Sequence, residues 1–507
     1  MPKSRVLVFI VAYQAEKTIE SVVRRIPTAL SDQYAIDVLI IDDSSHDKTF
    51  EKSHTLTRHA ELPFPIIVLF NPVNQGYGGN QKLGYRFAIE NGYDFVALLH
   101  GDGQYAPECL PDLLEPLRRG ETAAVMGSRM LTPRGALRGG MPRYKFLGNK
   151  ILTWLQNRLL HAELSEYHSG YRLYAVAALR SIPFEYNSNG FDFDTQIIIQ
   201  LMIAKLRIIE RPIPTYYGDE ICRVNGLRYA ADVIASTVRA RLQELSLFYD
   251  RKYDCAPAPL AQYSPKLSFD SPHSYVVRVV PKQARVLDLG CAGAYVGSAL
   301  IARKGCYVTG VDAVPVGTET LDEVYVRDLN QGLDGIPVER QDFVLLLDVI
   351  EHLASPERFL DQLREKLSLN PDAELIISTG NVGFFVTRLM LLLGQFNYGK
   401  RGILDLTHTR LFTFMSLTRT LEQAGFVIRE TRAIPAPFPL ALGQNTASRF
   451  LLRVNSFLNR IAPGLFAYQM IMRAKARPTV KSLLLAAQAE SRNRGKVLEA
   501  AANAGSR

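Results

Sequence analysis

Two oxygen-bearing side chains, Asp102 and Gln104, stand two residues apart just after the apolar run 95–99. The apolar run predicts a strand, so both side chains would lie in the loop at its carboxyl end. Carboxylate and amide oxygens are hard ligands that suit a divalent cation held against a diphosphate. We therefore expect a cation site here, although Asp102 taken alone is also compatible with an ordinary surface loop.

Polar clusters follow two other apolar runs of the N-terminal half. Asp42 and Asp43 come directly after 38–41, and a glycine-rich stretch at 74–80 follows 66–70. Asp-Asp-Ser-Ser is also helix N-cap chemistry, and a glycine-rich stretch is also typical of a simple turn. The order and spacing of the three clusters together favour a ligand site.

Alternating strands and helices would position these clusters. Apolar runs predict strands at 6–11, 38–41, 66–70 and 95–99, and helical periodicity predicts a helix over 18–30. Such alternation is typical of an open, mostly parallel sheet that binds ligands beyond the carboxyl ends of its strands.

The composition fits a multidomain globular protein. Its 507 residues, 47% of them apolar and 21% charged, predict two to four domains. The five cysteines have no metal-ligand spacing, and we find neither a secretory leader nor a run of about 18 uncharged apolar residues. We therefore expect a cytoplasmic protein with reduced cysteines. The formal charge of +9 suits phosphorylated substrates or an anionic membrane, and we expect no nucleic-acid partner.

Residues 4–230 resemble family 2 glycosyltransferases of the GT-A fold, in particular the branch similar to dolichol-phosphate-mannose synthase. The motifs that carry the resemblance are Val11-Ala12-Tyr13-Gln14-Ala15-Glu16, Asp42-Asp43-Ser44-Ser45-His46-Asp47, Asn74-Gln75-Gly76-Tyr77-Gly78, Gly127-Ser128-Arg129 and Ser169-Gly170-Tyr171-Arg172. The resemblance implies a nucleotide-sugar donor bound by Tyr13, Glu16, Asp42, Asp43, Gly76 and Gly78. It also implies that Arg129 and Arg172 donate to a diphosphate or to an acceptor phosphate.

Two residues depart from the family's pattern. His100 occupies the first position of the family's Asp-x-Asp, so we expect Asp102 to bind the cation, with Gln104 as a second ligand and His100 as a third candidate. An imidazole ligand favours Mn²⁺ over Mg²⁺, while His100 could instead contact phosphate alone. Ala15 replaces a glutamate expected near the ribose, and Glu16 is the neighbouring candidate for that contact.

Direct displacement at the anomeric carbon needs a stabilised leaving diphosphate and a deprotonated acceptor. We expect the cation and Arg129 or Arg172 to stabilise the diphosphate. Asp192 and Asp194, which precede an apolar helix, are the candidate general bases. Asp194 could instead cap that helix, and a phosphate acceptor would need no strong base because it is already ionised.

The segment after residue 211 is near the acceptor in related bacterial enzymes, so Tyr217, Asp219 and Glu220 are additional site candidates. Membrane-anchored relatives carry hydrophobic hairpins after this point. This chain has a charged helix at 230–249 instead, which favours a peripheral rather than an embedded enzyme.

A second fingerprint begins after a proline-rich stretch at 255–272. Gly290 and Gly293 form a turn after a strand that contains Asp288, and Asp312 ends the next strand roughly 20 residues later. A glycine-rich turn followed by an acid after the next strand is the pattern that holds the ribose of an adenosyl cofactor. A nicotinamide domain is the alternative, but its Gly-x-Gly-x-x-Gly motif is absent.

Residues 270–435 resemble class I S-adenosylmethionine methyltransferases, chiefly through the fourth-strand signature at 342–353, the fifth strand at 374–382 and the His-x-Arg-x-Phe-Thr element at 408–413. The resemblance implies that S-adenosylmethionine is bound by Asp288, Gly290, Gly293, Asp312, Asp328, Leu329 and Asp348. Ala292 and Ala294 replace two usual glycines, which would tighten the cofactor loop. His352 and His408 are candidates for the base or for orienting the acceptor, although a lone histidine is more often structural.

Beyond residue 443 the chain is basic, and apolar residues recur at helical spacing: Leu451, Leu452, Phe457, Leu458 and Ile461. Two interpretations remain open, an interfacial helix on anionic lipid and a helix packed on the methyltransferase core. We expect a GT-A domain at 1–250, a linker at 251–272, a methyltransferase domain at 273–440 and a basic amphipathic extension at 441–507.

The sequence therefore predicts an α/β chain with an N-terminal GT-A nucleotide-sugar domain and a C-terminal Rossmann-like class I methyltransferase domain. We expect a bifunctional enzyme that transfers a sugar, with inversion and a divalent cation (Mn²⁺ or Mg²⁺), to a glycan or polyprenyl-phosphate acceptor. It would also methylate a glycan or glycolipid hydroxyl, in the cytoplasm or on the inner membrane face. The alternatives are that one half is only a docking module, or that the chain is a non-catalytic membrane-peripheral scaffold.

Overall fold

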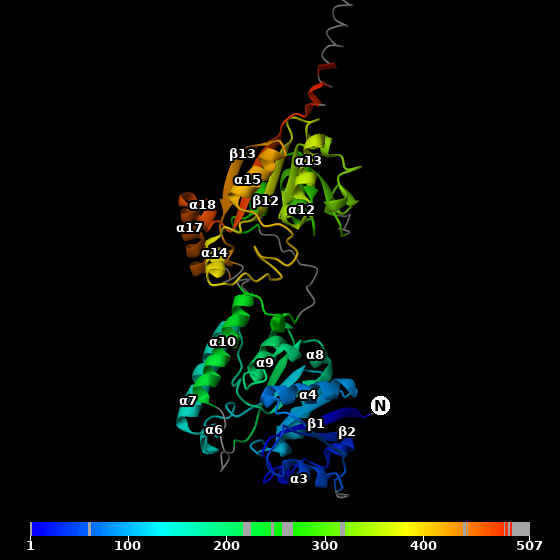
Figure 1. Cartoon of the computed structure of the whole chain (residues 1–507), viewed down its shortest axis with the longest axis vertical. Coiled ribbons are helices and arrows are strands. Elements are labelled where there is room, and N and C mark those ends of the chain that lie inside the picture. Colours follow the sequence, from blue (N-terminus) through cyan, green and yellow to red (C-terminus); the bar gives the residue numbers. More distant parts are fainter. Residues whose placement is uncertain are drawn as a thin grey trace, which may run out of the picture. The chain divides into compact units, whose positions relative to one another are not determined.

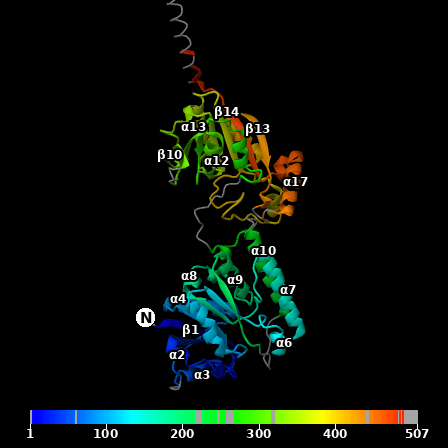
Figure 2. The same cartoon turned by 180° about the vertical axis from the view of Figure 1, so that it is seen from behind.

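The chain forms two compact units, Met1–Ala258 and Pro259–Arg507 (Figure 1). The computed structural model describes residues 3–58, 62–215, 225–244, 248–255, 267–314, 320–439, 443, 445–480, 482–484 and 487–488. Each unit contains a seven-stranded sheet with helices packed on both faces, as the two opposite views show (Figures 1 and 2).

The sheet of the first unit is mostly parallel, as expected. In spatial order its strands are β3 (Ile66–Phe70), β2 (Tyr34–Asp42), β1 (Ser4–Ala12), β4 (Phe95–His100), β6 (Arg172–Ala175), β5 (Ala124–Ser128) and β7 (Ile208–Pro212). Only β6 runs antiparallel to its two neighbours. The carboxyl ends of β1, β2 and β4 therefore meet at one edge of the sheet.

Side chains alternate between the two faces of the first sheet. Along β1, Val6, Val8 and Ile10 belong to one buried cluster, while Leu7 and Phe9 belong to another on the opposite face. The helices of this unit are α1 (Ile19–Arg24), α2 (Leu30–Gln33), α3 (Thr49–Leu56), α4 (Gly76–Glu90), α5 (Leu110–Arg118), α6 (Gly135–Arg138), α7 (Arg143–Leu160), α8 (Val176–Arg180), α9 (Phe193–Ile203) and α10 (Gly226–Glu244). The result is a helix–sheet–helix sandwich with a separate core on each side.

The single helix predicted over 18–30 is wrong. The structure has α1 and α2 in its place, separated at Pro27. Proline has no amide hydrogen to donate and disfavours a helical conformation in the residue before it, so the helix ends there.

The sheet of the second unit has the order β10 (Glu323–Val326), β9 (Tyr307–Asp312), β8 (Arg285–Leu289), β11 (Phe343–Leu347), β12 (Glu374–Gly380), β14 (Gln469–Ala476) and β13 (Phe426–Ile434). The first five strands are parallel and give the third–second–first–fourth–fifth order of a doubly wound sheet. β14 is antiparallel to both of its neighbours. Ligands are therefore expected at the carboxyl ends of β8, β9 and β11.

Two buried clusters hold the second sheet between its helices. Leu287 and Leu289 of β8 lie in one cluster, and Val286 lies in the other. The helices are α11 (Pro272–Val279), α12 (Tyr295–Lys304), α13 (Pro356–Leu367), α14 (Phe385–Leu392), α15 (Phe414–Gln423), α17 (Thr446–Ile461) and α18 (Pro463–Phe466).

The structure corrects both ends of the predicted methyltransferase domain. β14 pairs with β12 from Gln469 to Ala474, so the sheet includes residues that were assigned to the extension at 441–507. At the other end, Tyr253 and Cys255 are buried in cores of the first unit, and Ser271 caps α11. The predicted linker at 251–272 is therefore too long at both ends.

No disulfide joins Cys109, Cys255, Cys291 and Cys306 to one another, and Cys222 lies outside the described residues. Among the helices that the structure describes, none is both long and apolar enough to traverse a bilayer.

Candidate active sites

Three loops of the first unit converge where β1, β2 and β4 end. The Asp43 amide donates to the carbonyl of Ala12, and the Gly101 amide donates to the carbonyl of Val11, both at 2.9 Å. Side chains fasten the same loops together, because Thr18 Oγ1 donates to the Gly101 carbonyl at 2.6 Å. Parallel strands therefore bring the three predicted polar clusters to one edge.

Two residues of this edge hold strained backbone. Gln14 and Ser44 have φ angles of 50° and 63°, in the left-handed region that non-glycine residues rarely adopt. The Gln14 amide donates to Ser45 Oγ at 2.8 Å, which ties the first loop to the second. Strain of this kind persists only where the surrounding structure enforces it, and it is common at functional sites.

Asp43 organises the neighbouring loop. Its Oδ1 accepts from Asn71 Nδ2 and from the Gln75 amide, both at 2.8 Å, and its Oδ2 accepts from the Gly76 amide at 3.0 Å. Both carboxylate oxygens therefore accept hydrogen bonds, and those from Gln75 and Gly76 hold the glycine-rich stretch in place.

Asp42 is held differently. Its Oδ1 accepts from the Ser45 amide at 3.0 Å, but Oδ2 is buried and has no hydrogen-bond partner among the described residues. Burial raises the pKa of Asp42. The interpretation of Asp42 and Asp43 as helix caps is wrong, since α3 begins at Thr49 with Lys48 at its N-cap.

The glycines at 76 and 78 are required by the chain's own packing. Gly76 has a φ of +78°, and a Cβ there would lie 2.7 Å from the Asn189 carbonyl oxygen. A Cβ on Gly78 would lie 2.6 Å from both Phe193 Cβ and the Ser188 carbonyl oxygen. These glycines let the start of α4 approach the segment that leads into α9.

Asp194 lies at the centre of a buried network. Tyr77 Oη donates to its Oδ2 at 2.9 Å, and Gln81 Nε2 donates to its Oδ1 at 3.0 Å. Arg172 is 3.5 Å away as an ion-pair partner, with 1% of its side chain exposed. Asp194 lies inside the first turn of α9 rather than at its N-cap, so the capping interpretation is wrong.

The guanidinium group of Arg172 binds the backbone of its own unit. Its three donor groups bind the carbonyl oxygens of Ser169 at 2.8 Å, Asp194 at 2.6 Å and Tyr167 at 2.8 Å. The expectation that Arg172 donates directly to a phosphate is not compatible with this arrangement, since its fork points into backbone carbonyls. Arg172 positions Asp194 instead.

Arg129 pairs with Glu166, a residue that the sequence did not single out. The two side chains form a short hydrogen bond, and the Arg129 amide also donates to Glu166 Oε2 at 2.8 Å. Asn149 Nδ2 adds a third donor to Glu166 at 2.8 Å. Arg129 holds the pKa of Glu166 below its usual range despite burial.

His100 contacts Tyr77 through Nε2 at 3.0 Å. Because Tyr77 donates its only hydroxyl hydrogen to Asp194, His100 must donate from Nε2, which leaves Nδ1 as the nitrogen with a lone pair. Burial lowers the pKa of His100, which favours this neutral ring. The ring packs edge-on against Tyr77 and Tyr105, at centroid distances of 5.4 and 4.9 Å.

Asp102 is exposed, and its Oδ1 accepts from the Gln104 amide at 3.1 Å. Within the described residues, no group of three or more histidine, cysteine, aspartate or glutamate side chains could enclose a metal ion. The donor set therefore fits a cation that takes one protein carboxylate and completes its shell with substrate phosphates, as Mg²⁺ commonly does.

The remaining candidates of the first unit lie at the rim. Tyr13 is 40% exposed, and Glu16 accepts from the Lys48 amide at 2.9 Å. Asp192 accepts from Ser188 and, at 2.6 Å, from Gln196 Nε2. The three candidates at 217, 219 and 220 lie outside the described residues.

In the second unit, the turn after β8 wraps around Asp312. The Ala292 amide donates to Asp312 Oδ2 at 2.8 Å, and the Val314 amide donates to Oδ1 at 2.9 Å. Ala292 and Ala294 have φ angles of 45° and 58°. Alanine therefore occupies left-handed positions that glycine would fill without strain, which is the physical reason for the usual glycines there.

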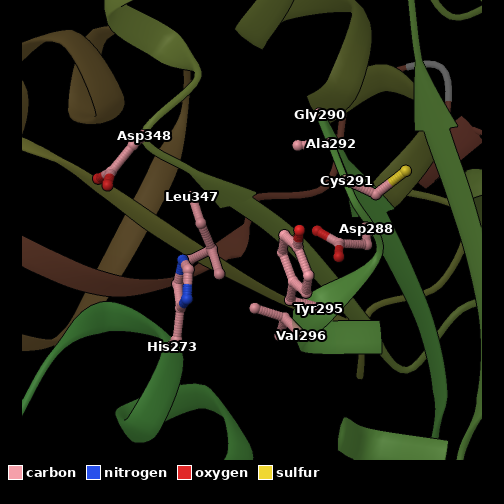
Figure 3. A pocket seen from close by; sticks show the side chains of 9 residues that line it. All are labelled: His273, Asp288, Gly290, Cys291, Ala292, Tyr295, Val296, Leu347 and Asp348. Carbon is pink, nitrogen blue, oxygen red and sulfur yellow. The ribbon is translucent and has the colours of Figure 1, made fainter. Parts of the chain in front are cut away.

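A cavity of about 110 Å³ lies beside this turn (Figure 3). Its lining comprises His273, Asp288, Gly290, Cys291, Ala292, Tyr295, Val296, Leu347 and Asp348. In Figure 3 the Tyr295 ring lies next to Asp288, while Asp348 stands on the far side. Burial, with the charge of Asp312 nearby, raises the pKa of Asp288 to about 7.

Other predicted cofactor residues have defined structural partners. Asp328 Oδ1 accepts from the Asn330 amide at 2.9 Å and caps the short helix that buries Leu329. A Cβ on Gly293 would lie 2.6 Å from the Tyr295 ring. Gly293 therefore lets that ring cover the turn.

Asp348 lies on strained backbone, with φ at 56°. Its Oδ1 accepts from Ser378 Oγ and its Oδ2 accepts from Gln469 Nε2, both at 2.7 Å. Gln469 belongs to β14, so a strand from the expected extension contributes directly to the site. Burial and the nearby charge of Asp348 raise the pKa of Glu351.

His352 and His408 lie together, with ring centroids 4.7 Å apart. His352 Nδ1 is 3.2 Å from the Thr407 carbonyl oxygen, and His408 Nδ1 is 2.9 Å from the Ile403 carbonyl oxygen. A carbonyl only accepts, so each Nδ1 carries a hydrogen, and the neutral form of each ring has its lone pair on Nε2. Burial lowers the pKa of His408.

Sequence reasoning missed several residues that build these sites. Tyr77 lies inside the glycine-rich motif at 74–78, where only the glycines were given a role, and Glu166 lies just before the motif at 169–172. His273 and Tyr295 line the cavity from α11 and α12, but nothing in their spacing marked them.

The fold and the two sites define a GT-A-type sugar transferase joined to a methyltransferase. A family model described as glycosyl transferase family 2 matches residues 7–182, and one described as a methyltransferase domain matches residues 251–431. The undecaprenyl-phosphate mannosyltransferase of Micrococcus luteus is 31% identical over 214 residues, which cover 41% of this chain and 82% of that protein. The chain therefore belongs to glycosyltransferase family 2, and it carries a methyltransferase domain in addition.

Two further relatives differ in chemistry. The UDP-N-acetylglucosamine–dolichyl-phosphate N-acetylglucosaminyltransferase of Methanococcus voltae is 26% identical, over 43% of this chain and 88% of that protein. The ubiquinone biosynthesis O-methyltransferase of Azorhizobium caulinodans is 39% identical over 108 residues, which cover 20% of this chain and 42% of that protein. The names of the two transferase relatives thus specify different sugars.

Proposed function

We propose that the first unit transfers a sugar from a nucleotide donor to a polyprenyl-phosphate or glycan acceptor, and that the second unit methylates a glycan or glycolipid hydroxyl with S-adenosylmethionine. The observation that carries the first half is the convergence of Asp42, Asp43 and Asp102 at one sheet edge, fastened by left-handed residues. The names of the two transferase relatives support a lipid-phosphate acceptor.

Asp42 is the best candidate for reading the donor's base or ribose. Its buried Oδ2 has no hydrogen-bond partner among the described residues, so a donor N–H or O–H group placed there would satisfy it. Asp43 is saturated and acts by holding the glycine-rich stretch. Tyr13 and Glu16, at the rim, would complete the nucleotide site.

Asp102 would hold the cation, with Gln104 beside it and His100 Nδ1 as the remaining candidate ligand. A bound divalent cation would neutralise the charge that develops on the leaving diphosphate. The chain's own contribution is to keep the Asp102 loop fixed through Thr18 and to keep His100 neutral and oriented through Tyr77.

A phosphate acceptor removes the need for a strong base. Asp194 accepts from two side chains and pairs with Arg172, and Asp192 accepts from Ser188 and Gln196. Both carboxylates are thus committed to hydrogen bonds with protein groups. An acceptor phosphate, already ionised at neutral pH, could attack without surrendering a proton to either.

The second unit has groups suited to methyl transfer. S-adenosylmethionine would supply the electrophilic methyl group, held between Asp312, Asp328 and the turn at 290–294. His352 and His408 each keep an Nε2 lone pair and could take a hydroxyl proton as the acceptor reacts. The O-methyltransferase relative supports a hydroxyl acceptor.

Calorimetric titration tests both halves on the intact chain. We expect Asp42→Asn to weaken nucleotide-sugar binding and leave S-adenosylmethionine binding unchanged, and Asp312→Asn to do the reverse. Binding of only one ligand would reduce the proposal to one active half with a docking module. Binding of neither ligand would contradict it and favour a scaffold.

A further inference from the structure

The helix α17 of the second unit exposes its apolar side. Phe450, Val454, Phe457 and Ile461 have 65%, 39%, 61% and 65% of their surfaces exposed. With 3.6 residues per turn, these four positions form one stripe along the helix. Of the five apolar residues predicted at helical spacing, Phe457 and Ile461 belong to this exposed stripe, whereas Leu451, Leu452 and Leu458 are partly buried.

The opposite side of α17 is polar and buried. Ser448, Asn455 and Asn459 are each at most 6% exposed. Asn455 Oδ1 accepts from the Ala436 amide at 2.8 Å, and its Nδ2 donates to the Phe466 carbonyl at 2.9 Å. Asn455 therefore anchors the buried side of the helix through hydrogen bonds, while the four most exposed apolar residues face outward, unlike in an ordinary surface helix.

A neighbouring helix has the same arrangement. In α14 the exposed residues are Phe385 at 41%, Leu389 at 52% and Leu392 at 84%, while Thr387 is buried. Phe385 of α14 contacts Phe466 of α18, with ring centroids 5.9 Å apart. In both views α14 lies beside α17 and α18, and we call this region the apolar corner (Figures 1 and 2).

The positive charge beside the apolar corner indicates which kind of partner covers it. Arg449, Arg453 and Arg460 are exposed and form a row beside the stripe, and neither α14 nor α17 contains an acidic residue. Phenylalanine and leucine on one side with arginine along the edge is the composition of helices that lie in the headgroup region of anionic bilayers. An antiparallel pair of α17 helices from two copies is disfavoured, because a two-fold axis perpendicular to the helices would place the two arginine rows on the same side of the interface.

We propose that the apolar corner docks the second unit onto an anionic bilayer, with α17 lying in the plane of the interface. The stripe would enter the acyl boundary, and the arginine row would contact lipid phosphates. The proposal depends only on the surface of the second unit, so it stands whether or not either transfer reaction takes place.

Sedimentation of the full chain with vesicles tests this. We expect binding to phosphatidylcholine vesicles that contain phosphatidylglycerol, and much weaker binding without phosphatidylglycerol or in about 1 M salt, where the Debye length is about 3 Å. Phe450→Ser with Phe457→Ser should weaken binding at least about tenfold. Val326→Ser with Leu369→Ser is the matched control, because these residues are 60% and 58% exposed elsewhere in the same unit, and it should bind like the wild type.

The first unit offers a competing surface, since Leu147 and Ile151 of α7 are also exposed. If Leu147→Ser with Ile151→Ser abolished vesicle binding and the Phe450/Phe457 variant did not, the proposal would be overturned. The absence of vesicle binding by the wild type, or a Phe450/Phe457 variant that only dissociates a dimer in light scattering, would overturn it equally.

A second variant guards against misfolding. Replacing Arg449, Arg453 and Arg460 with glutamine leaves the stripe intact and should weaken binding to phosphatidylglycerol vesicles at least about tenfold, since each arginine near the surface is attracted to anionic lipid. Unchanged circular dichroism melting would show that both variants are folded. Unchanged vesicle binding by the arginine variant would contradict the anionic-lipid partner.

Discussion

Buried acids near the two sheet edges differ in the hydrogen bonds that their side chains accept. In the first unit, Asp43 and Asp194 each accept at least two hydrogen bonds from neighbouring groups. In the second unit, Asp288 is buried, its side chain accepts no hydrogen bond from the described residues, and its pKa rises to about 7. Asp43 and Asp194 are therefore held by protein groups, whereas the Asp288 side chain, like one oxygen of Asp42 in the first unit, has no hydrogen-bond partner among the described residues.

The difference has a consequence for stability. A saturated, paired carboxylate supports the fold, and removing it leaves other buried groups without partners. An unsatisfied buried carboxyl lowers stability whenever it ionises. Asp194→Asn and Asp288→Asn should therefore change the stability of their units in opposite directions.

The largest effect is expected at Asp194. Asp194→Asn leaves the buried Arg172 without its counter-ion, and losing one member of a buried pair typically costs about 3–5 kcal/mol. Trp154, the single tryptophan, lies in the first unit, so its fluorescence reports unfolding there. Asp192→Asn, at a half-buried site with neutral partners, should cost about 1 kcal/mol. Equal losses in the two variants would contradict the central role of Asp194.

Asp288→Asn should act in the opposite direction and depend on pH. The folded-state pKa of about 7 lies above the ordinary value of 3.8, so the carboxyl's contribution is complete below about pH 4 and is lost as pH rises through 7. Without added ligand, the free energy of unfolding of the variant should rise relative to that of the wild type by a few kcal/mol between pH 4 and pH 8. Each unit of pKa shift corresponds to about 1.4 kcal/mol. Scanning calorimetry measures this difference in the unfolding transition of the second unit, which Trp154 fluorescence does not report. A pH-independent difference would refute it.

A smaller effect is expected where the first edge is tightly packed. Gly78→Ala places a methyl group 2.6 Å from Phe193 Cβ, so the segment before α9 must shift, at a cost of about 1–3 kcal/mol. Gly148→Ala is the control, since no atom lies within 4 Å of its added Cβ and alanine favours a helix. Denaturant unfolding followed by Trp154 fluorescence gives the free energy of unfolding of both variants. A neutral Gly78→Ala would mean that the close approach is not needed.

The smallest effect concerns the turn of the second edge. Ala292 is exposed and has a φ of 45°, so Ala292→Gly should relieve strain and stabilise the unit by about 0.5 kcal/mol. Ala299→Gly, in the interior of α12, should destabilise by about 1 kcal/mol. Two substitutions of the same chemistry would then shift the calorimetric midpoint in opposite directions, and a shared direction would contradict the strain at Ala292.

Much of the architecture could be predicted because its signals are local. Apolar runs marked the parallel strands, and parallel strands place their following loops at one edge, so Asp42, Asp102 and Asp312 were found at strand ends. The position of β14 could not be predicted, because its pairing with β12 joins residues about 95 positions apart and its apolar run is short.

The roles of individual side chains were harder to predict than their locations. The motif around Arg172 correctly drew attention to that residue, but sequence cannot show whether an arginine's donors reach a ligand or backbone carbonyls. For the same reason Asp42 and Asp43, adjacent in sequence, could not be told apart, although one is saturated and the other keeps a free buried oxygen.

The most direct test of the account is nucleotide release by the intact chain, with Mn²⁺ or Mg²⁺, a panel of sugar nucleotides and a polyprenyl-phosphate acceptor. We predict metal-dependent turnover of one donor that falls by about 100-fold or more in Asp102→Ala, since the group that holds charge against the leaving diphosphate is lost. Asp112→Ala, at an exposed position on α5, should turn over like the wild type. Full metal-dependent turnover in Asp102→Ala would contradict the proposed site.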